Sequence, residues 1–140
     1  MSDRQRMLRV AGWTEPRGYT NGVCAAGTMV VLAGQIGWNP STGLFETDDF
    51  AAQVRQTLAN IVQLLEEAGA APEDLVRLTW FVTDRDEYVR AHREIGAAYR
   101  ATVGSHYPPM SVVIVAGLLE SRAKVEIEAT AVVPRAAEPA

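Results

Sequence analysis

Cysteine is almost absent from this chain of 140 residues, because Cys24 is its only one. A single cysteine cannot form an internal disulfide, and no Cys/His spacing typical of a zinc site occurs, so we expect neither a metal nor a cofactor. A chain without disulfides suits a reducing compartment, and we therefore expect a cytoplasmic protein. We expect Cys24 itself to be a small buried residue of a strand.

Long apolar runs and basic clusters are also missing. No stretch of about eighteen apolar residues occurs, and the polar residues 1–6 do not resemble a signal peptide, so we expect no membrane partner. The 13 basic residues are scattered among 17 acidic ones, which leaves a net charge of -4. Because phosphate binding needs concentrated positive charge, this pattern disfavours nucleic acid as a partner.

The composition that remains is that of an ordinary globular protein, with 48% hydrophobic and 21% charged residues. Its length suits one domain and leaves little room for two. We therefore expect a single domain over residues 1–133. The Ala- and Pro-rich residues 134–140 are expected to form a flexible tail.

Four segments have the composition of strands. Residues 28–33, 75–82 and 111–116 are rich in β-branched, aromatic and other apolar side chains. Residues 125–133 alternate instead, with Val125, Ile127, Ala129 and Ala131 on one side and Glu126, Glu128 and Thr130 on the other.

Two segments have the periodicity of helices. Apolar residues recur at helical spacing from Phe50 to Ala68, with Asp48 or Asp49 as the N-cap and Gly69 as the stop. A second helix is expected from about Asp86 to Gly104, with an apolar side made of Tyr88, Ala91, His92, Ile95 and Tyr99.

This order of elements predicts an α+β fold with a mixed sheet and two helices packed on one face. The other face of the sheet would then carry Glu126 and Glu128 beside large apolar side chains. Because such a mixed face is seldom left open to water in a small protein, we expect association of subunits to cover it.

Four motifs, in order, resemble those of the Rid/YjgF family of RidA-like reactive intermediate deaminases. Residues 31–37 (VLAGQIG), with Asn-Pro and Thr-Gly shortly after, are similar to "SGQIP…P.TG". Residues 53–61 (QVRQTLANI), 81–84 (FVTD) and 125–129 (VEIEA) are similar to "Q.RQ.L.N", "FV.D" and "VEIEA". Order and spacing hold from about Tyr19 to Val133, so the chain is identified as a member of this family.

The resemblance implies a chorismate-mutase-like fold and a homotrimer with a central barrel-like core. Small-molecule ligands would bind in clefts between subunits. Archetypal members hydrolyse enamines and imines, such as 2-aminoacrylate, to a carbonyl compound and ammonia. Some members lack this activity, and others have been described as endoribonucleases or translation inhibitors. Three functions therefore stay open: an enamine/imine deaminase, a non-catalytic trimeric binding protein and, with the least support, an endoribonuclease.

The resemblance also implies a set of site residues. Glu126 matches the family's acidic residue and would orient and activate a water molecule. Residues that would line the substrate cleft are Tyr19, Ala33, Gly34, Trp38, His92 and Met110.

Three of these positions depart from the family pattern. Met110 stands where the family has the arginine that binds the substrate carboxylate, Ala33 where it often has serine, and His92 where the archetype has asparagine. A thioether cannot grip a carboxylate, so we expect a substrate other than 2-aminoacrylate. Arg17 is a candidate substitute for the missing arginine, and Arg122 is a weaker one. His106 is a further candidate proton carrier.

Overall fold

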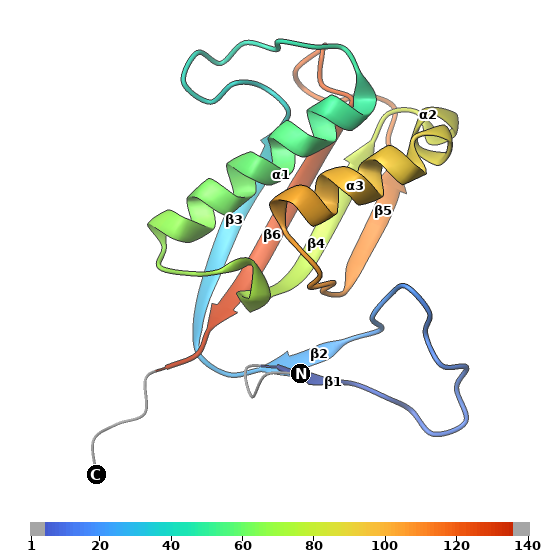
Figure 1. The fold of residues 1–140 in the computed structure, drawn as a ribbon, viewed down its shortest axis with the longest axis vertical. Coiled ribbons are helices and arrows are strands. Elements are labelled where there is room, and N and C mark those ends of the chain that lie inside the picture. The colour runs from blue at the N-terminus through green and yellow to red at the C-terminus, as the bar shows by residue number, and fades with distance from the viewer. Residues whose placement is uncertain (1–4, 136–140) are drawn as a thin grey trace.

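A four-stranded sheet, covered on one face by helices, forms the centre of the structure, a computed structural model that describes residues 5–135 (Figure 1). The strands lie in the order β3-β6-β4-β5. Their bounds are Thr28–Ile36 for β3, Val125–Val133 for β6, Leu75–Val82 for β4 and Met110–Ile114 for β5. β6 is antiparallel to both β3 and β4, whereas β5 is parallel to β4. The prediction of an α+β fold with a mixed sheet is confirmed.

The first predicted helix is α1 (Phe50–Glu67). Its N-cap is Asp49, whose carboxylate accepts a hydrogen bond from the Ala52 amide at 2.9 Å. The cap satisfies an amide that has no partner within the helix, which is why the helix begins here. The apolar stripe from Phe50 to Leu65 is buried, but Ala68 is exposed. A short 3-10 helix, Pro72–Asp74, then leads into β4.

The second predicted helix is divided in two. α2 (Arg85–Arg90) and α3 (His92–Thr102) meet at Ala91, whose ψ of 10° interrupts the helical backbone. Residues on either side of Ala91 therefore do not share one helical face. Ile95 and Tyr99 are buried as expected, but His92 is exposed, so its expected place on the apolar side of the helix is wrong.

The sequence did not indicate the small hairpin that precedes the sheet. β1 (Gln5–Met7) pairs with β2 (Val23–Ala25) at the end of the sheet where β5 begins (Figure 1). The amide of Gln5 fastens it by donating to the carbonyls of Glu73 and Leu75 at 2.9 and 3.0 Å. Cys24 lies in β2 but is exposed, so the prediction of a buried cysteine is wrong. The hairpin is too small to cover both of its own faces.

The face of the sheet away from the helices is open. We call it the open face; it carries Met29, Val31, Phe81, Val113, Glu126 and Glu128. Met29 and Val31 are 67% and 69% exposed, whereas Ile127 and Val125 on the helical side are fully buried. The predicted alternation along residues 125–133 is therefore confirmed.

The predicted C-terminal tail and the expected lack of a membrane span can be compared with the structure. Of the predicted tail at residues 134–140, residues 136–140 lie outside the described part of the chain. Among the helices that the structure describes, none is both long and apolar enough to cross a bilayer.

Candidate functional site

The first feature of the candidate site is a β-bulge in β3, formed at the GQI segment. Leu32 pairs with Ala129 and Gln35 with Ile127, so two residues of β3, Ala33 and Gly34, lie opposite one residue of β6. The Gln35 side chain donates to the Ala33 carbonyl at 3.0 Å across the bulge. Bulges bend a strand and redirect its side chains, and they are frequent beside functional sites.

Glu126 lies directly over this bulge. A Cβ atom built on Gly34 would come within 2.7 Å of Glu126 Oε2. The cross-strand neighbour of Glu126 on β4 is Phe81, so the carboxylate has an aromatic flank. Glu126 is half-buried, and no hydrogen bond or ion pair joins its carboxylate to another residue in the described range. The structure therefore brings together Ala33, Gly34 and Glu126.

Trp38 follows β3 and is held near this end of the sheet by α1. Asn60 donates to the carbonyls of Ile36 and Trp38 at 3.2 and 3.1 Å. Gln56 orients the Asn60 amide by donating to its oxygen at 2.8 Å. The Trp38 ring contacts Phe45, with centroids 6.2 Å apart.

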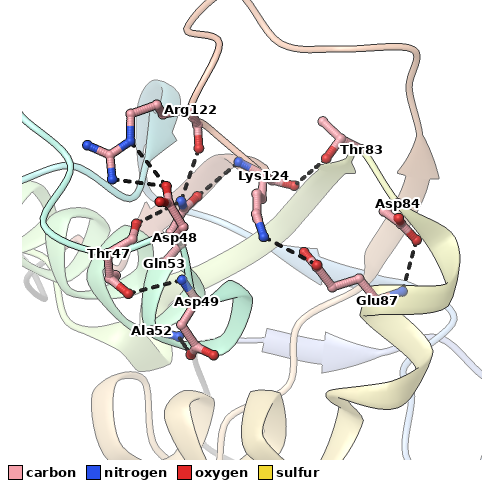
Figure 2. A network of polar contacts seen from close by, with 10 residues as sticks. All are labelled: Thr47, Asp48, Asp49, Ala52, Gln53, Thr83, Asp84, Glu87, Arg122 and Lys124. Atoms are coloured by element: carbon pink, nitrogen blue, oxygen red, sulfur yellow. Dashed lines mark hydrogen bonds and ion pairs between the residues drawn. The ribbon is translucent and has the colours of Figure 1, made fainter.

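The fully buried Gln53 fixes the start of β6 (Figure 2). Its amide nitrogen donates to the carbonyls of Thr47 and Arg122 at 3.1 and 3.0 Å. Its amide oxygen accepts from the backbone N–H of Lys124 at 2.9 Å, two residues before Glu126. The Q.RQ.L.N pattern thus has a physical meaning: amides on α1 clamp the backbone on both sides of the candidate site.

The two cations of this network are already engaged. Arg122 Nε and Nη2 both donate to Asp48 Oδ1, at 3.1 and 2.9 Å, and Nη1 donates to the Phe45 carbonyl. Lys124 Nζ lies 3.3 Å from Glu87 Oε2 (Figure 2). Arg122 is therefore a poor substitute for a substrate-binding arginine.

Tyr19 and Met110 belong to the opposite end of the sheet. The residue after Tyr19, Thr20, donates its hydroxyl to the Tyr107 carbonyl at 2.8 Å. Tyr19 is 54% exposed on the segment that joins β1 to β2, and Arg17 is exposed on the same segment (Figure 1). Met110 opens β5, three residues after Tyr107. Within one subunit, none of these residues meets Glu126.

Met110 also lies on the other face of the sheet. It pairs with the fully buried Leu78 and packs against the core beneath the helices. Paired residues of neighbouring strands share a face, so Met110 points away from the open face that carries Glu126.

Neither histidine belongs to the strands that form the open face. His92 is exposed at the start of α3, in the helical layer. His106 is half-buried, and its Nε2 donates to the Leu75 carbonyl at 2.8 Å. Its own carbonyl accepts from the Tyr99 hydroxyl. Burial, and then the neighbouring Tyr107, raise the pKa of Tyr99 well above its usual range. These contacts give His106 a structural role at the end of the sheet where β5 begins.

The structure adds Arg77 to the residues of interest. It pairs with Thr130, is exposed on the open face, and forms no ion pair with another described residue. It lines a cleft of about 430 Å³ with Asn21 and Pro109. The only signal in the sequence was an arginine inside an apolar strand. Within residues 5–135 no three His, Cys, Asp or Glu side chains gather as a metal site would require.

The fold and the bulged GQI strand beneath a glutamate define a Rid-type protein. The family model described as Endoribonuclease L-PSP matches residues 14–133. The 2-iminobutanoate/2-iminopropanoate deaminase of Escherichia coli K12 is 39% identical over 117 residues, which cover 81% of this chain and 86% of that protein. A RutC family protein of Haemophilus influenzae is 36% identical over 106 residues, 76% of this chain and 80% of that protein.

Solved structures that resemble this chain come from the same family. The Rid family protein YyfB of Yersinia pestis, a protein of unknown function, has a TM-score of 0.79 and 30% identity, covering 93% of this chain and 99% of that one. The YjgF gene product of E. coli has a TM-score of 0.64 and 36% identity, covering 90% and 92%. The chain therefore belongs to the Rid/YjgF family.

Proposed function

We propose that this protein is an enamine/imine deaminase, which hydrolyses its substrate to a carbonyl compound and ammonia. The observation that carries the proposal is the half-buried Glu126 carboxylate, which has no partner among the described residues and lies over the GQI bulge. The name of the E. coli relative, a deaminase of 2-imino acids, supports the same class of reaction. The free cysteine agrees with the cytoplasmic location that we expect.

The reaction needs one oriented water molecule and one group that exchanges protons. Glu126 accepts one proton from the water as the water oxygen bonds to the imine carbon, and it passes this proton to the imine nitrogen, which gives a neutral carbinolamine. Glu126 then takes the hydroxyl proton as the C=O bond forms and delivers it to the amino nitrogen as the C–N bond breaks, so that ammonia leaves and the carboxylate is regenerated. An enamine reaches the same path after it tautomerises to the imine. Because the imine carbon is already electrophilic, holding the reactants in place supplies much of the acceleration.

We further propose that the site is shared between subunits of a homotrimer. Glu126 and the bulge lie at one end of the sheet, whereas Tyr19 lies on the segment beside the other end. These groups can line one cleft only if the Glu126 end of one subunit lies against the Tyr19 end of another. The exposed apolar side chains of the open face, such as Met29 and Val31, supply a reason to associate.

The proposed substrate lacks the small amino-acid carboxylate of 2-aminoacrylate. Met110 replaces the arginine expected from the family pattern, and its side chain packs against the core. If an acidic substrate is used after all, Arg17 and Arg77 are the candidates for its carboxylate, because neither has an ion pair among the described residues.

A trimeric binding protein without catalysis is the second candidate. It is favoured by the loss of two polar groups from the family pattern, at Ala33 and Met110. The endoribonuclease activity in the family model's name has less support, because a net charge of -4 without a basic cluster suits RNA poorly.

The test is a screen of imines generated in situ by amino-acid oxidases, with ammonia release as the readout. On any imine that is turned over, Glu126→Gln keeps the shape of the side chain and removes proton exchange, so kcat should fall on the order of a hundredfold. Full turnover by Glu126→Gln would refute the role of the carboxylate. Ligand binding between subunits without any turnover would favour the binding protein.

A further inference from the structure

Position 34 has no backbone reason to be glycine. Its φ lies outside the positive range that side chains avoid, unlike that of Gly43 or Gly69. The restriction on the residue at position 34 is steric. A Cβ atom at position 34 would meet Oε2, Cδ and Cγ of Glu126 at 2.7, 2.8 and 2.9 Å. All three nearest atoms belong to this one side chain, so a side chain at position 34 would collide first with Glu126.

We propose that Gly34 is a positioning residue: the bare backbone of the bulge forms a seat across which the Glu126 side chain lies, and this seat sets where the carboxylate points. The catalytic consequence rests on the deaminase function proposed above. The seat itself is a property of the folded chain and holds whatever the ligand is.

A small rotation at the tip of Glu126 cannot make room for a methyl group. The Cγ atom is as crowded as the carboxylate, so the whole side chain has to leave its rotamer. An alanine at position 34 would therefore move the carboxylate away from the bulge. The Glu126 carboxylate forms no hydrogen bond or ion pair with another described residue, so no such contact would hold it in its original direction.

Two other glycines near this end of the sheet provide the contrast. A Cβ atom at Gly37 would meet the Gln53 backbone, with 2.7 Å to its carbonyl oxygen, so Gly37 serves the contact between β3 and α1. A Cβ atom at Gly117 would meet nothing within 4 Å, and its φ is not positive. Gly117→Ala is therefore the matched control for Gly34→Ala.

The test follows the Glu126 carboxyl carbon directly. Protein labelled with ¹³C at the glutamate Cδ is studied by NMR, and the Glu126 resonance is assigned by its loss in Glu126→Gln. We expect Gly34→Ala to move this resonance and Gly117→Ala to leave it in place. An unchanged resonance in Gly34→Ala would overturn the proposal. This result does not depend on whether any imine is hydrolysed.

Thermal unfolding keeps the proposal testable if Gly34→Ala folds poorly. The added methyl should lower Tm by about 3–10 °C with Glu126 present, and by less than about 2 °C in Glu126→Ala, where the crowding atoms are gone. An equal loss of Tm in both backgrounds would overturn the proposal that Gly34 makes room for Glu126.

A kinetic arm links the seat to the proposed function. On an imine that the wild type hydrolyses, Gly34→Ala should lower kcat about tenfold and shift its pH profile, with little change in KM. If the NMR shift appears but kcat is unchanged, the seat exists and its catalytic role is overturned.

Discussion

The two faces of the sheet are built from the same strands but serve different ends. On the helical face of β6, Val125, Ile127 and Ala131 are fully buried, and α1 packs on this strand. On the open face, the alternate residues Glu126 and Glu128 stand beside exposed apolar side chains from β3 and β5. One face therefore holds the fold together, and we assign association and chemistry to the other. Mutation of neighbouring residues of β6 should therefore change the free energy of unfolding to very different extents, depending on the face that each residue occupies.

The largest loss of stability is expected on the helical face. Ile127→Ala removes a fully buried side chain and leaves a cavity, so the free energy of unfolding should fall by about 2–5 kcal/mol. Glu126→Gln, one residue earlier, should change it by less than about 0.5 kcal/mol. Denaturant unfolding of both variants measures the difference. Strong destabilisation by Glu126→Gln would show that the carboxylate is structural.

The second prediction concerns 2-iminopropanoate. Losing a charged, bidentate contact typically costs roughly 2–5 kcal/mol, so turnover should be tens to thousands of times slower than in a relative with arginine at the Met110 position. Ammonia release from both proteins, measured side by side, checks this. Comparable rates would mean that another cation has taken over. In that case Arg17→Ala and Arg77→Ala would identify it, because only the residue in use should abolish turnover.

The third prediction concerns the backbone next to the site. Gln53→Met keeps the length of the side chain but leaves the backbone groups of Thr47, Arg122 and Lys124 without their partner. We expect a loss of about 2–4 kcal/mol in denaturant unfolding. Gln56→Met, whose amide donates only to Asn60 among the described residues, is the control and should lose about 1 kcal/mol. Equal losses would mean that Gln53 is no special clamp.

The smallest effect on the folded subunit is expected on the open face. Wild-type protein at micromolar concentration should sediment at about three times 15.2 kDa. Val31→Asp places a charge on the face that we expect to be covered, so trimer dissociation should increase at least about tenfold. Far-UV circular dichroism should stay unchanged, because Val31 is exposed in the subunit. A wild-type protein that sediments as a monomer would contradict the assembly.

Composition and periodicity were enough to predict most of the sheet and the apolar face of α1. Residues 75–82, predicted from their apolar composition, coincide with β4, and residues 125–133, predicted from their alternation, coincide with β6. The hairpin gave no such signal, since its strands have three residues each and begin with Gln5 and Val23. The division of the second helix at Ala91 was missed because the helical spacing of apolar residues continues across it.

The candidate site was predictable as a set of residues but not as an arrangement. The family motifs select Gly34 and Glu126, and the structure places these two in contact. The family resemblance also implies Tyr19 and Met110, but the Thr20–Tyr107 hydrogen bond and the register of β5 place these two at the other end of the sheet. The sequence also gave no sign that Met110 faces the core, because β5 is almost wholly apolar and lacks alternation.

The most direct test of a site shared between subunits is complementation. Glu126→Gln and Tyr19→Ala are prepared separately and then co-assembled in equal amounts, with ammonia release from an active imine as the readout. If Glu126 of one subunit and Tyr19 of another form each site, random assembly makes about one site in four fully wild type, so about a quarter of wild-type activity should return. Activity no greater than the average of the two separate variants would contradict a shared site and place all catalytic groups within one subunit.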